Sequence, residues 1–201
     1  MNHPKKERTF ILIKPDGIQR SLIGEIISRF ERVGLKIVGV KMIIPSQEQI
    51  KAQYGNTKEE IEAMGRRSIE AQEKKYGVKP TKTALERGED IFEGLKKFMS
   101  SGPILTMVLE GNQVVEVAKK LIGSTEPLSS DVGTVRGDYT IDSYALADFD
   151  KRAVRNVIHR SGSKEEAEKE IKIWFSSEEI LQYKLISESI LYDVNLDGIL
   201  E

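Results

Sequence analysis

The sequence lacks cysteine altogether, and histidine is almost absent. Without cysteine there are no disulfide bonds, no thiolate nucleophile and no zinc site with cysteine ligands. The formal net charge of −1 excludes the basic excess with which many proteins hold nucleic acid, so no nucleic-acid partner is expected. No stretch approaches the ~18 apolar residues of a membrane span, and the charged residues 1–8 precede no signal-like apolar run. We expect a cytoplasmic protein without a membrane partner.

The scarcity of histidine narrows the choice of a catalytic base or nucleophile. His3 lies in a polar leader, so His159 is the one internal histidine. It stands between a short apolar strand and a helix that Ser163 and Glu166 should begin as a capping box. Glu170 falls beside the apolar stripe of that helix and could reach back to the ring. A carboxylate on one ring nitrogen fixes the tautomer and leaves the other nitrogen free to attack, although an isolated histidine is more often structural.

Hydrophobic periodicity predicts a core of six elements. Strands are predicted at residues 9–14, 35–44, 104–109 and 154–159, and helices at 21–33 and 114–122. Pro15 should end the first strand at Lys14, because the residue before proline is pushed toward extended geometry. The element order indicates a mixed α/β (α+β) fold with a ferredoxin-like βαββαβ core, in which an antiparallel sheet carries two main helices on one face.

Two stretches interrupt this core. Residues 56–88 are dense in charge and predict a helix from 58 to about 75, which we interpret as a solvated excursion rather than a substrate lid or a partner surface. Residues 125–152 have many turn formers and predict a long ordered loop, which compact domains usually keep for function. We expect a single domain over residues 1–201, with insertions at about 56–88 and 140–152 and a C-terminal extension at about 185–201.

Four short motifs follow one another in a characteristic order. They are Lys14-Pro15-Asp16-Gly17, Ser101-Gly102-Pro103, Arg136-Gly137-Asp138 after Gly133-Thr134, and Asn156-x-x-His159-x-Ser161. Each is weak alone, but the four in this order are specific, and the chain resembles nucleoside diphosphate kinases over residues 7–56, 91–139 and 155–184.

The resemblance implies a ping-pong reaction. His159 would take the γ-phosphoryl group of a nucleoside triphosphate, become phosphohistidine, and pass the group to a nucleoside diphosphate, while Glu170 orients the ring. Mg²⁺ would bridge the β- and γ-phosphates without direct protein ligands. The partners would be nucleoside di- and triphosphates and further copies of the chain in a homo-oligomer.

Matching positions give the expected binding residues. By resemblance, Lys14 binds the transferred phosphoryl region, Arg136 and Lys119 the nucleotide phosphates, Thr125 a phosphate oxygen, Asn156 the ribose, and Tyr54 and Phe92 the base. During transfer, a phosphoryl group spreads negative charge over its three oxygens, and fixed cations can stabilise this charge. Stacking on Phe92 would tolerate any base, so we expect broad nucleoside specificity.

The chain also departs from the family pattern. Arg160 stands where the family usually has glycine, Gly162 where it has aspartate, and Lys119 where arginine is common. Arg160 could add a cation near the phosphates or point to solvent, Gly162 could loosen the turn, and Lys119 gives up the guanidinium fork, which predicts weaker nucleotide binding. One alternative is therefore a family member that binds nucleotide with reduced or lost turnover. The other, from another class, is an RNA-binding ferredoxin-like module, but residues 35–44 and 104–110 lack its aromatic basic strand.

Two smaller features complete the expectations. Asn156 and His159 are separated by an odd number of residues, so in a regular strand they would face opposite ways, and the strand must end or twist between them. Residues 193–198 copy the first half of a calcium-binding loop, but Glu201 ends the sequence before the position of the bidentate glutamate. A polar turn is favoured there over calcium binding.

Overall fold

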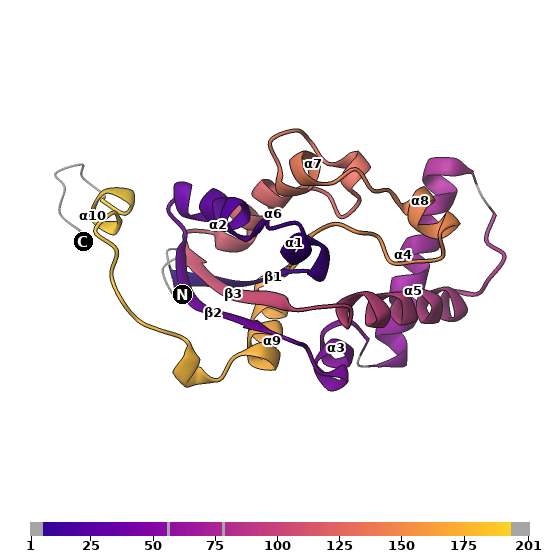
Figure 1. The fold of residues 1–201 in the computed structure, drawn as a ribbon, viewed down its shortest axis with the longest axis horizontal. Helices are drawn as coiled ribbons and strands as arrows, with labels where there is room; N and C mark the ends of the chain where they lie inside the picture. Colours follow the sequence, from indigo (N-terminus) through magenta and orange to yellow (C-terminus); the bar gives the residue numbers. More distant parts are fainter. Residues whose placement is uncertain (1–5, 56, 78, 194–201) are drawn as a thin grey trace.

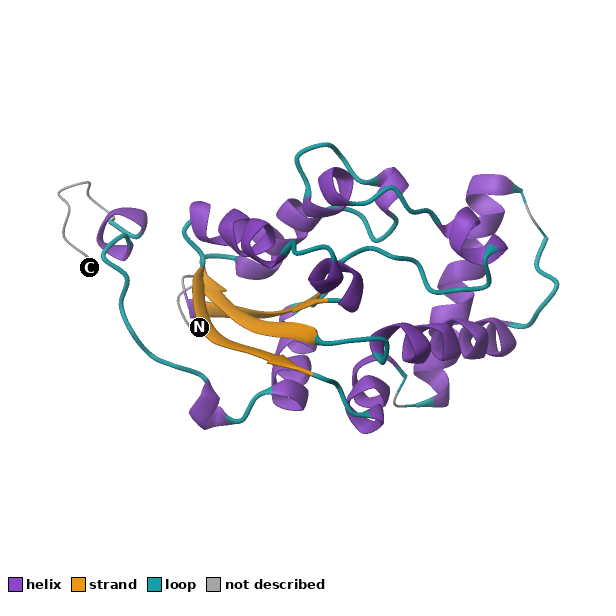
Figure 2. Ribbon diagram, viewed as in Figure 1, coloured by secondary structure: helices purple, strands orange, loops and turns teal. Residues whose placement is uncertain are grey.

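The computed structural model describes residues 6–55, 57–77 and 79–193. Its centre is an antiparallel sheet of β1 (Glu7–Ile13), β2 (Lys36–Ile43), β3 (Ile104–Gly111) and β4 (Ile158–Arg160) in the order β2-β3-β1-β4 (Figures 1 and 2). This order confirms the ferredoxin-like core predicted from the periodicity.

Both faces of the sheet are covered by helices, because side chains along β1 alternate between two buried clusters. Ile11 and Ile13 pack with α2 (Ile23–Arg32) and α6 (Val114–Ile122), the two helices expected on one face. Phe10 and Leu12 pack on the opposite face with α3 (Gln47–Tyr54) and α9 (Lys164–Trp174). Figure 1 shows these two helix layers above and below the strands. This second layer was not foreseen as a layer from the sequence.

The charged insertion forms a helical hairpin at one end of the sheet. The helix predicted at 58 to about 75 is confirmed as α4 (Lys58–Tyr76), and α5 (Ala84–Met99) follows it. Capping boxes from Thr57 and Thr83 begin the two helices. The helices touch backbone to backbone, since a Cβ on Gly65 would lie 1.8 Å from the Ala84 oxygen. Glycine at that position is therefore a packing requirement.

The predicted long loop at 125–152 is more regular than expected. It contains α7 (Val135–Tyr139) and α8 (Tyr144–Phe149), which begin at the side-chain caps Thr134 and Ser143. Another short helix, α1 (Pro15–Gln19), begins directly after Lys14, where Pro15 was expected to end the first strand. Helices of five or six residues leave too few turns for apolar periodicity to reveal them.

The strand predicted at 154–159 is wrong at its start. β4 begins only at Ile158, because Val157 adopts a left-handed backbone with φ of 56°. This conformation is strained for a β-branched residue. It is held from both sides, since the Val157 amide donates to Asp16 Oδ2 at 3.1 Å and its carbonyl accepts from the Lys14 amide at 2.8 Å. The expected break between Asn156 and His159 is thus confirmed.

The C-terminal extension returns to the far end of the sheet. Its short helix α10 (Glu188–Leu191) is joined to β2 by the ion pair of Lys36 and Glu188 at 2.9 Å. The half calcium loop at 193–198 lies, apart from Asp193, outside the described residues. Over the described ranges, no helix combines the length and the apolar character needed to cross a membrane.

Candidate active site

The floor of the site begins where β1 ends. Lys14 follows the last residue of β1 and is only 5% exposed. Its Nζ donates to Asn156 Oδ1 at 2.7 Å, and the Asn156 amide donates in turn to the Thr125 carbonyl at 2.8 Å. Burial lowers the pKa of Lys14 to about 8, and the charge of Arg136 lowers it in the same direction. The ammonium group is therefore fixed, and among the described residues its hydrogen bond goes to a neutral amide oxygen rather than to a carboxylate.

Arg136 on α7 is the second cation of the floor, also 5% exposed. Its guanidinium donates to three backbone carbonyls, those of Asn156 at 3.4 Å, Gly123 at 3.2 Å and Ile158 at 2.8 Å. A guanidinium has five N–H donors, so two remain for a ligand. Burial lowers the pKa of Arg136 to about 10, with Arg160 acting in the same direction.

His159 lies on β4 with its ring held through one nitrogen. Its Nε2 is 2.7 Å from Oε1 of Glu170, which is 3% exposed on α9. Because a carboxylate accepts, the ring donates from Nε2. In the described part of the chain every hydrogen-bonding contact of the ring involves Nε2, so Nδ1 is the nitrogen left for a substrate. Tyr54 packs edge-on against the ring, with centroids 5.8 Å apart.

These residues meet at a cleft of about 1310 Å³. The predicted site residues that line it are Lys14, Tyr54, Thr125, Arg136, Asn156 and His159. Glu170 lies behind the ring rather than in the lining, as suits a residue that orients the imidazole. The opposite side of the cleft is formed partly by α4 and α8, so the insertion does border the site.

Two predicted residues are placed elsewhere. Phe92 is 9% exposed and is not in the cleft lining, whereas its neighbour Ile91 is. Lys119 is exposed on α6, where it pairs with Glu116 at 3.4 Å, and it is also missing from the lining. The structure therefore does not bring Phe92 or Lys119 together with the other site residues.

Two of the departures from the family pattern, Arg160 and Gly162, lie in the turn after His159. Arg160 is half-buried and lines the cleft, and within the described ranges its buried Nε has no hydrogen-bond partner. The Gly162 amide donates to Glu166 Oε2 at 2.7 Å, and a Cβ on Gly162 would lie 2.6 Å from that oxygen. The Glu166 carboxylate thus fills the space beside Gly162. The predicted capping box is half right, because Ser163 caps α9 while Glu166 turns to Gly162 instead.

Sequence reasoning missed the roles of two polar residues near the pair of His159 and Glu170. Ser161 Oγ donates to Glu170 Oε2 at 2.6 Å, which its position two residues after His159 on an extended segment could have indicated. Gln53 on α3 donates to Glu170 Oε1, and no local pattern pointed to it. It comes from a helix more than a hundred residues earlier in the chain.

Comparisons with known proteins agree with this geometry. The family model described as "Nucleoside diphosphate kinase" matches residues 7–64 and 72–180. A nucleoside diphosphate kinase of Pyrobaculum aerophilum is 45% identical over 181 residues, which cover 88% of this chain and 98% of that protein. These matches span nearly all of the described core.

Solved structures give the same result. An NDP kinase crystal structure from Pyrobaculum aerophilum has a TM-score of 0.82 at 43% identity and covers 88% of this chain and all of that one. A Borrelia burgdorferi nucleoside-diphosphate kinase, solved as a transition-state mimic with vanadate and ADP, has a TM-score of 0.75 at 35% identity and covers 92% of this chain and 96% of that one. The findings favour phosphoryl transfer over the two alternatives. The chain belongs to the nucleoside diphosphate kinase family and is a phosphotransferase that moves phosphoryl groups between nucleotides.

Proposed function

We propose that phosphoryl transfer runs through Nδ1 of His159 by a ping-pong mechanism. In the first half, the Nδ1 lone pair forms a bond to the γ-phosphorus of a nucleoside triphosphate. The bond between that phosphorus and the β–γ bridging oxygen breaks, and the diphosphate leaves with the electron pair. In the second half, a terminal oxygen of another nucleoside diphosphate takes the group from nitrogen. The observation that carries the proposal is that Nε2 is engaged by Glu170 while Nδ1 is left for substrate.

Lys14 and Arg136 would stabilise the charge on the transferred group. Both are buried beside the nucleophile and held by hydrogen bonds before any ligand binds, so little reorganisation is needed during the reaction. Arg160, in the same lining, adds a cation near the phosphates, as suggested from the sequence. Thr125 would bind a phosphate oxygen. The ribose contact of Asn156 stays a prediction, because its buried amide is already bonded to Lys14 and Thr125.

Phosphotransferases of this family generally need a divalent cation, and we propose Mg²⁺. In the described part of the chain no three histidine or acidic side chains cluster to hold a metal. The nucleotide phosphates and water would hold such an ion, and Lys14 and Arg136 would position those phosphates. The ion would neutralise phosphate charge.

A nucleobase needs an aromatic or apolar surface on which to stack. Phe92 is packed away from the cleft, and Ile91 offers an apolar surface in its place. Broad use of nucleosides stays a prediction. Measuring kcat/KM for the four common nucleoside triphosphates tests it, and rejection of three of them by orders of magnitude would contradict it.

We also propose a homo-oligomer, supported by the edge strand β2. Val40, Met42 and Ile44 on and just after this strand are more than half exposed, an apolar row that a second copy could cover. Light scattering would give the solution mass, and a strictly monomeric protein would exclude the proposal. The cytoplasmic location and the single-domain organisation stay predictions.

Incubation with γ-labelled ATP tests the main proposal. The protein should acquire an acid-labile, base-stable label that a nucleoside diphosphate discharges, and His159→Ala should abolish it. Nucleotide binding by His159→Ala, measured by calorimetry, should persist and serves as the control for folding. A label that survives in His159→Ala would exclude this nucleophile, and binding without label in the native chain would favour the alternative of lost turnover.

A further inference from the structure

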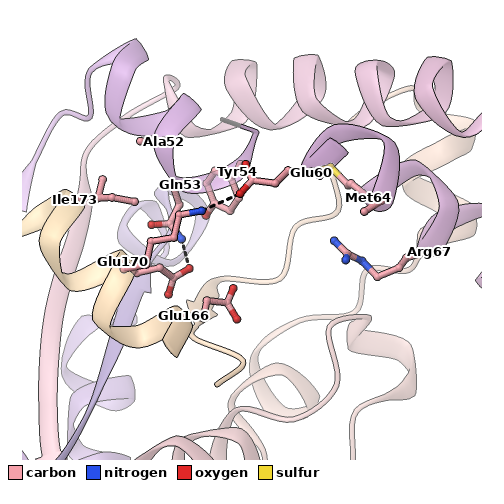
Figure 3. A pocket seen from close by; sticks show the side chains of 11 residues that line it. Ala52, Gln53, Tyr54, Glu60, Met64, Arg67, Glu166, Glu170 and Ile173 are labelled. Carbon is pink, nitrogen blue, oxygen red and sulfur yellow. Dashed lines mark hydrogen bonds and ion pairs between the residues drawn. The ribbon is translucent and has the colours of Figure 1, made fainter. Parts of the chain in front are cut away.

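The end of α3 places a glutamine directly beside the pair of His159 and Glu170. The side-chain nitrogen of Gln53 donates to Glu170 Oε1 and lies 3.2 Å from His159 Nε2. On its other side, Gln53 Oε1 accepts a hydrogen bond from the Trp174 indole at 2.6 Å. Figure 3 shows the Gln53 and Glu170 side chains pointing toward each other between α3 and α9. Gln53 thus links three elements of the site.

The Trp174 contact determines which way the Gln53 amide points. An indole nitrogen only donates, so the atom facing it at 2.6 Å must be the amide oxygen. The amide NH₂ is then obliged to face Glu170 and the histidine ring. This matters because the two ends of a glutamine amide are otherwise interchangeable by a flip. Trp174 therefore fixes the donor on the side where the carboxylate lies.

Three donors converge on the buried Glu170 carboxylate. Ser161 Oγ binds Oε2 at 2.6 Å, while His159 Nε2 and the Gln53 amide share Oε1. An amide NH₂ has donors and no accepting lone pair, so it cannot take the ring proton. Gln53 fixes where Oε1 sits, and the position of Oε1 decides where the Nε2 proton of His159 points. Without Gln53, the histidine ring would be the one side-chain donor left on Oε1 among the described residues, and Oε1 would be held less firmly.

We propose that Gln53 is a positioning residue for phosphoryl transfer. Acting through Glu170, it holds the imidazole as the Nε2–H tautomer with the Nδ1 lone pair facing the cleft. The effect on transfer rests on the proposed role of His159, whereas the effect on the tautomer does not. A misplacement of about 1 Å can cost ~100-fold in rate, so an indirect contact can matter to the reaction.

The test replaces Gln53 by methionine, which has similar length and neither amide group. In Gln53→Met, the single-turnover rate of His159 phosphorylation should fall roughly 10- to 100-fold, while the nucleotide Kd stays unchanged. Nitrogen NMR of the imidazole should show the Nε2–H tautomer in the native protein and a mixture in the variant. Gln47→Met, an exposed glutamine on the same helix, is the matched control and should leave both readouts unchanged.

A second variant removes only the orienting contact. Trp174→Phe keeps an aromatic ring in the core but deletes the indole N–H, so the Gln53 amide can flip and the phosphorylation rate should fall by a smaller factor. A native rate together with a pure Nε2–H tautomer in Gln53→Met would overturn the proposal. If Gln53→Met loses its folded NMR spectrum, the tautomer in Trp174→Phe decides instead, and an unchanged tautomer there counts against the proposal. If the phosphoryl label persisted in His159→Ala, that result would instead contradict the proposed function.

Discussion

The floor of the cleft and the insertion beside it hold their charges in different ways. On the floor, Lys14 and Arg136 are each 5% exposed and bond to an asparagine side chain and to backbone carbonyls. On the insertion, Glu60 of α4 pairs with Lys169 of α9 at 2.8 Å, with the two side chains 39% and 55% exposed. Exposed pairs contribute ~0 to 1 kcal/mol, because water and salt screen them. The floor is built to bind charge, whereas this ion pair between the insertion and α9 is a weak surface contact.

The two buried cations of the floor also lie close to other cations. The pKa of Lys14 is lowered to about 8 and that of Arg136 to about 10, in both cases first by burial and then by a neighbouring cation. Buried like charges raise the free energy of the empty site, and an anion placed between them relieves this repulsion. A nucleotide phosphate would therefore gain more at the floor than at any exposed lysine of α4.

The largest effect is expected at Arg136. In Arg136→Lys the charge stays, but the fork that reaches three carbonyls is lost, so the remaining ammonium cannot bind both the backbone and a phosphate. We expect kcat/KM to fall roughly 100- to 1,000-fold, the loss typical of a missing transition-state donor. Steady-state kinetics measure this, and Arg66→Lys on the exposed face of α4 is the control. A loss below tenfold would mean that the floor is less pre-organised than its hydrogen bonds indicate.

The pH dependence should separate the activity of the floor from its stability. As pH rises through about 8, Lys14 loses its proton in the free enzyme, so kcat/KM should fall there. Stability should move the other way. The Lys14 pKa is 10.5 in the unfolded chain and about 8 in the folded chain. Between these two pH values the unfolded state binds more protons, so the free energy of unfolding increases as the pH rises.

The comparison is with Lys14→Met. Its kcat/KM, though low, should show no step near pH 8, and its unfolding free energy from urea titration should rise less between pH 8 and 10.5 than that of the native chain. Parallel stability curves for the two proteins would show that the Lys14 pKa is not lowered on folding.

The features of the fold and the site that could be predicted from the sequence are those that local patterns determine. The strands, α2 and α6 follow from apolar periodicity, and α4 follows from the charge pattern of the insertion. The motifs identify Lys14, Arg136, Asn156 and His159 because each lies at or near the end of an element that the topology brings to one cleft. These positions depend on the backbone path, which local patterns largely determine.

The positions that escaped prediction depend on tertiary packing. Whether Ile91 or Phe92 faces the cleft depends on how α5 is rotated against α4, and the sequence of α5 alone does not fix this rotation. Lys119 pairs with Glu116 on its own helix, and no motif in the sequence reveals this contact. Val157 has a left-handed backbone that is held by hydrogen bonds to Asp16 and Lys14, which lie far away in the sequence.

An intermediate effect is expected where the insertion meets α8. Asp148 on α8 accepts hydrogen bonds from Gln72 of α4 and Arg87 of α5, and these side chains are only partly exposed. Asp148→Ala should cost about 1 kcal/mol of stability and increase hydrogen exchange in α8. We expect kcat to stay native and KM to rise slightly, as measured by kinetics beside the exchange data. An unchanged exchange rate in α8 would show that other contacts hold this helix.

The smallest effect is expected for the pair of Glu60 and Lys169. Glu60 is also the third residue of α4, where its carboxylate accepts from the Thr57 amide at 3.1 Å in the capping box. Glutamine serves in a capping box as well, so Glu60→Gln removes the charge of the ion pair and keeps the helix start. A double-mutant cycle with Lys169→Met should give a coupling within about 0.5 kcal/mol, with kcat/KM unchanged. A tenfold loss of kcat/KM in Glu60→Gln would contradict the view that this pair is only a weak surface contact. It would make the position of α4 part of catalysis rather than a border of the cleft.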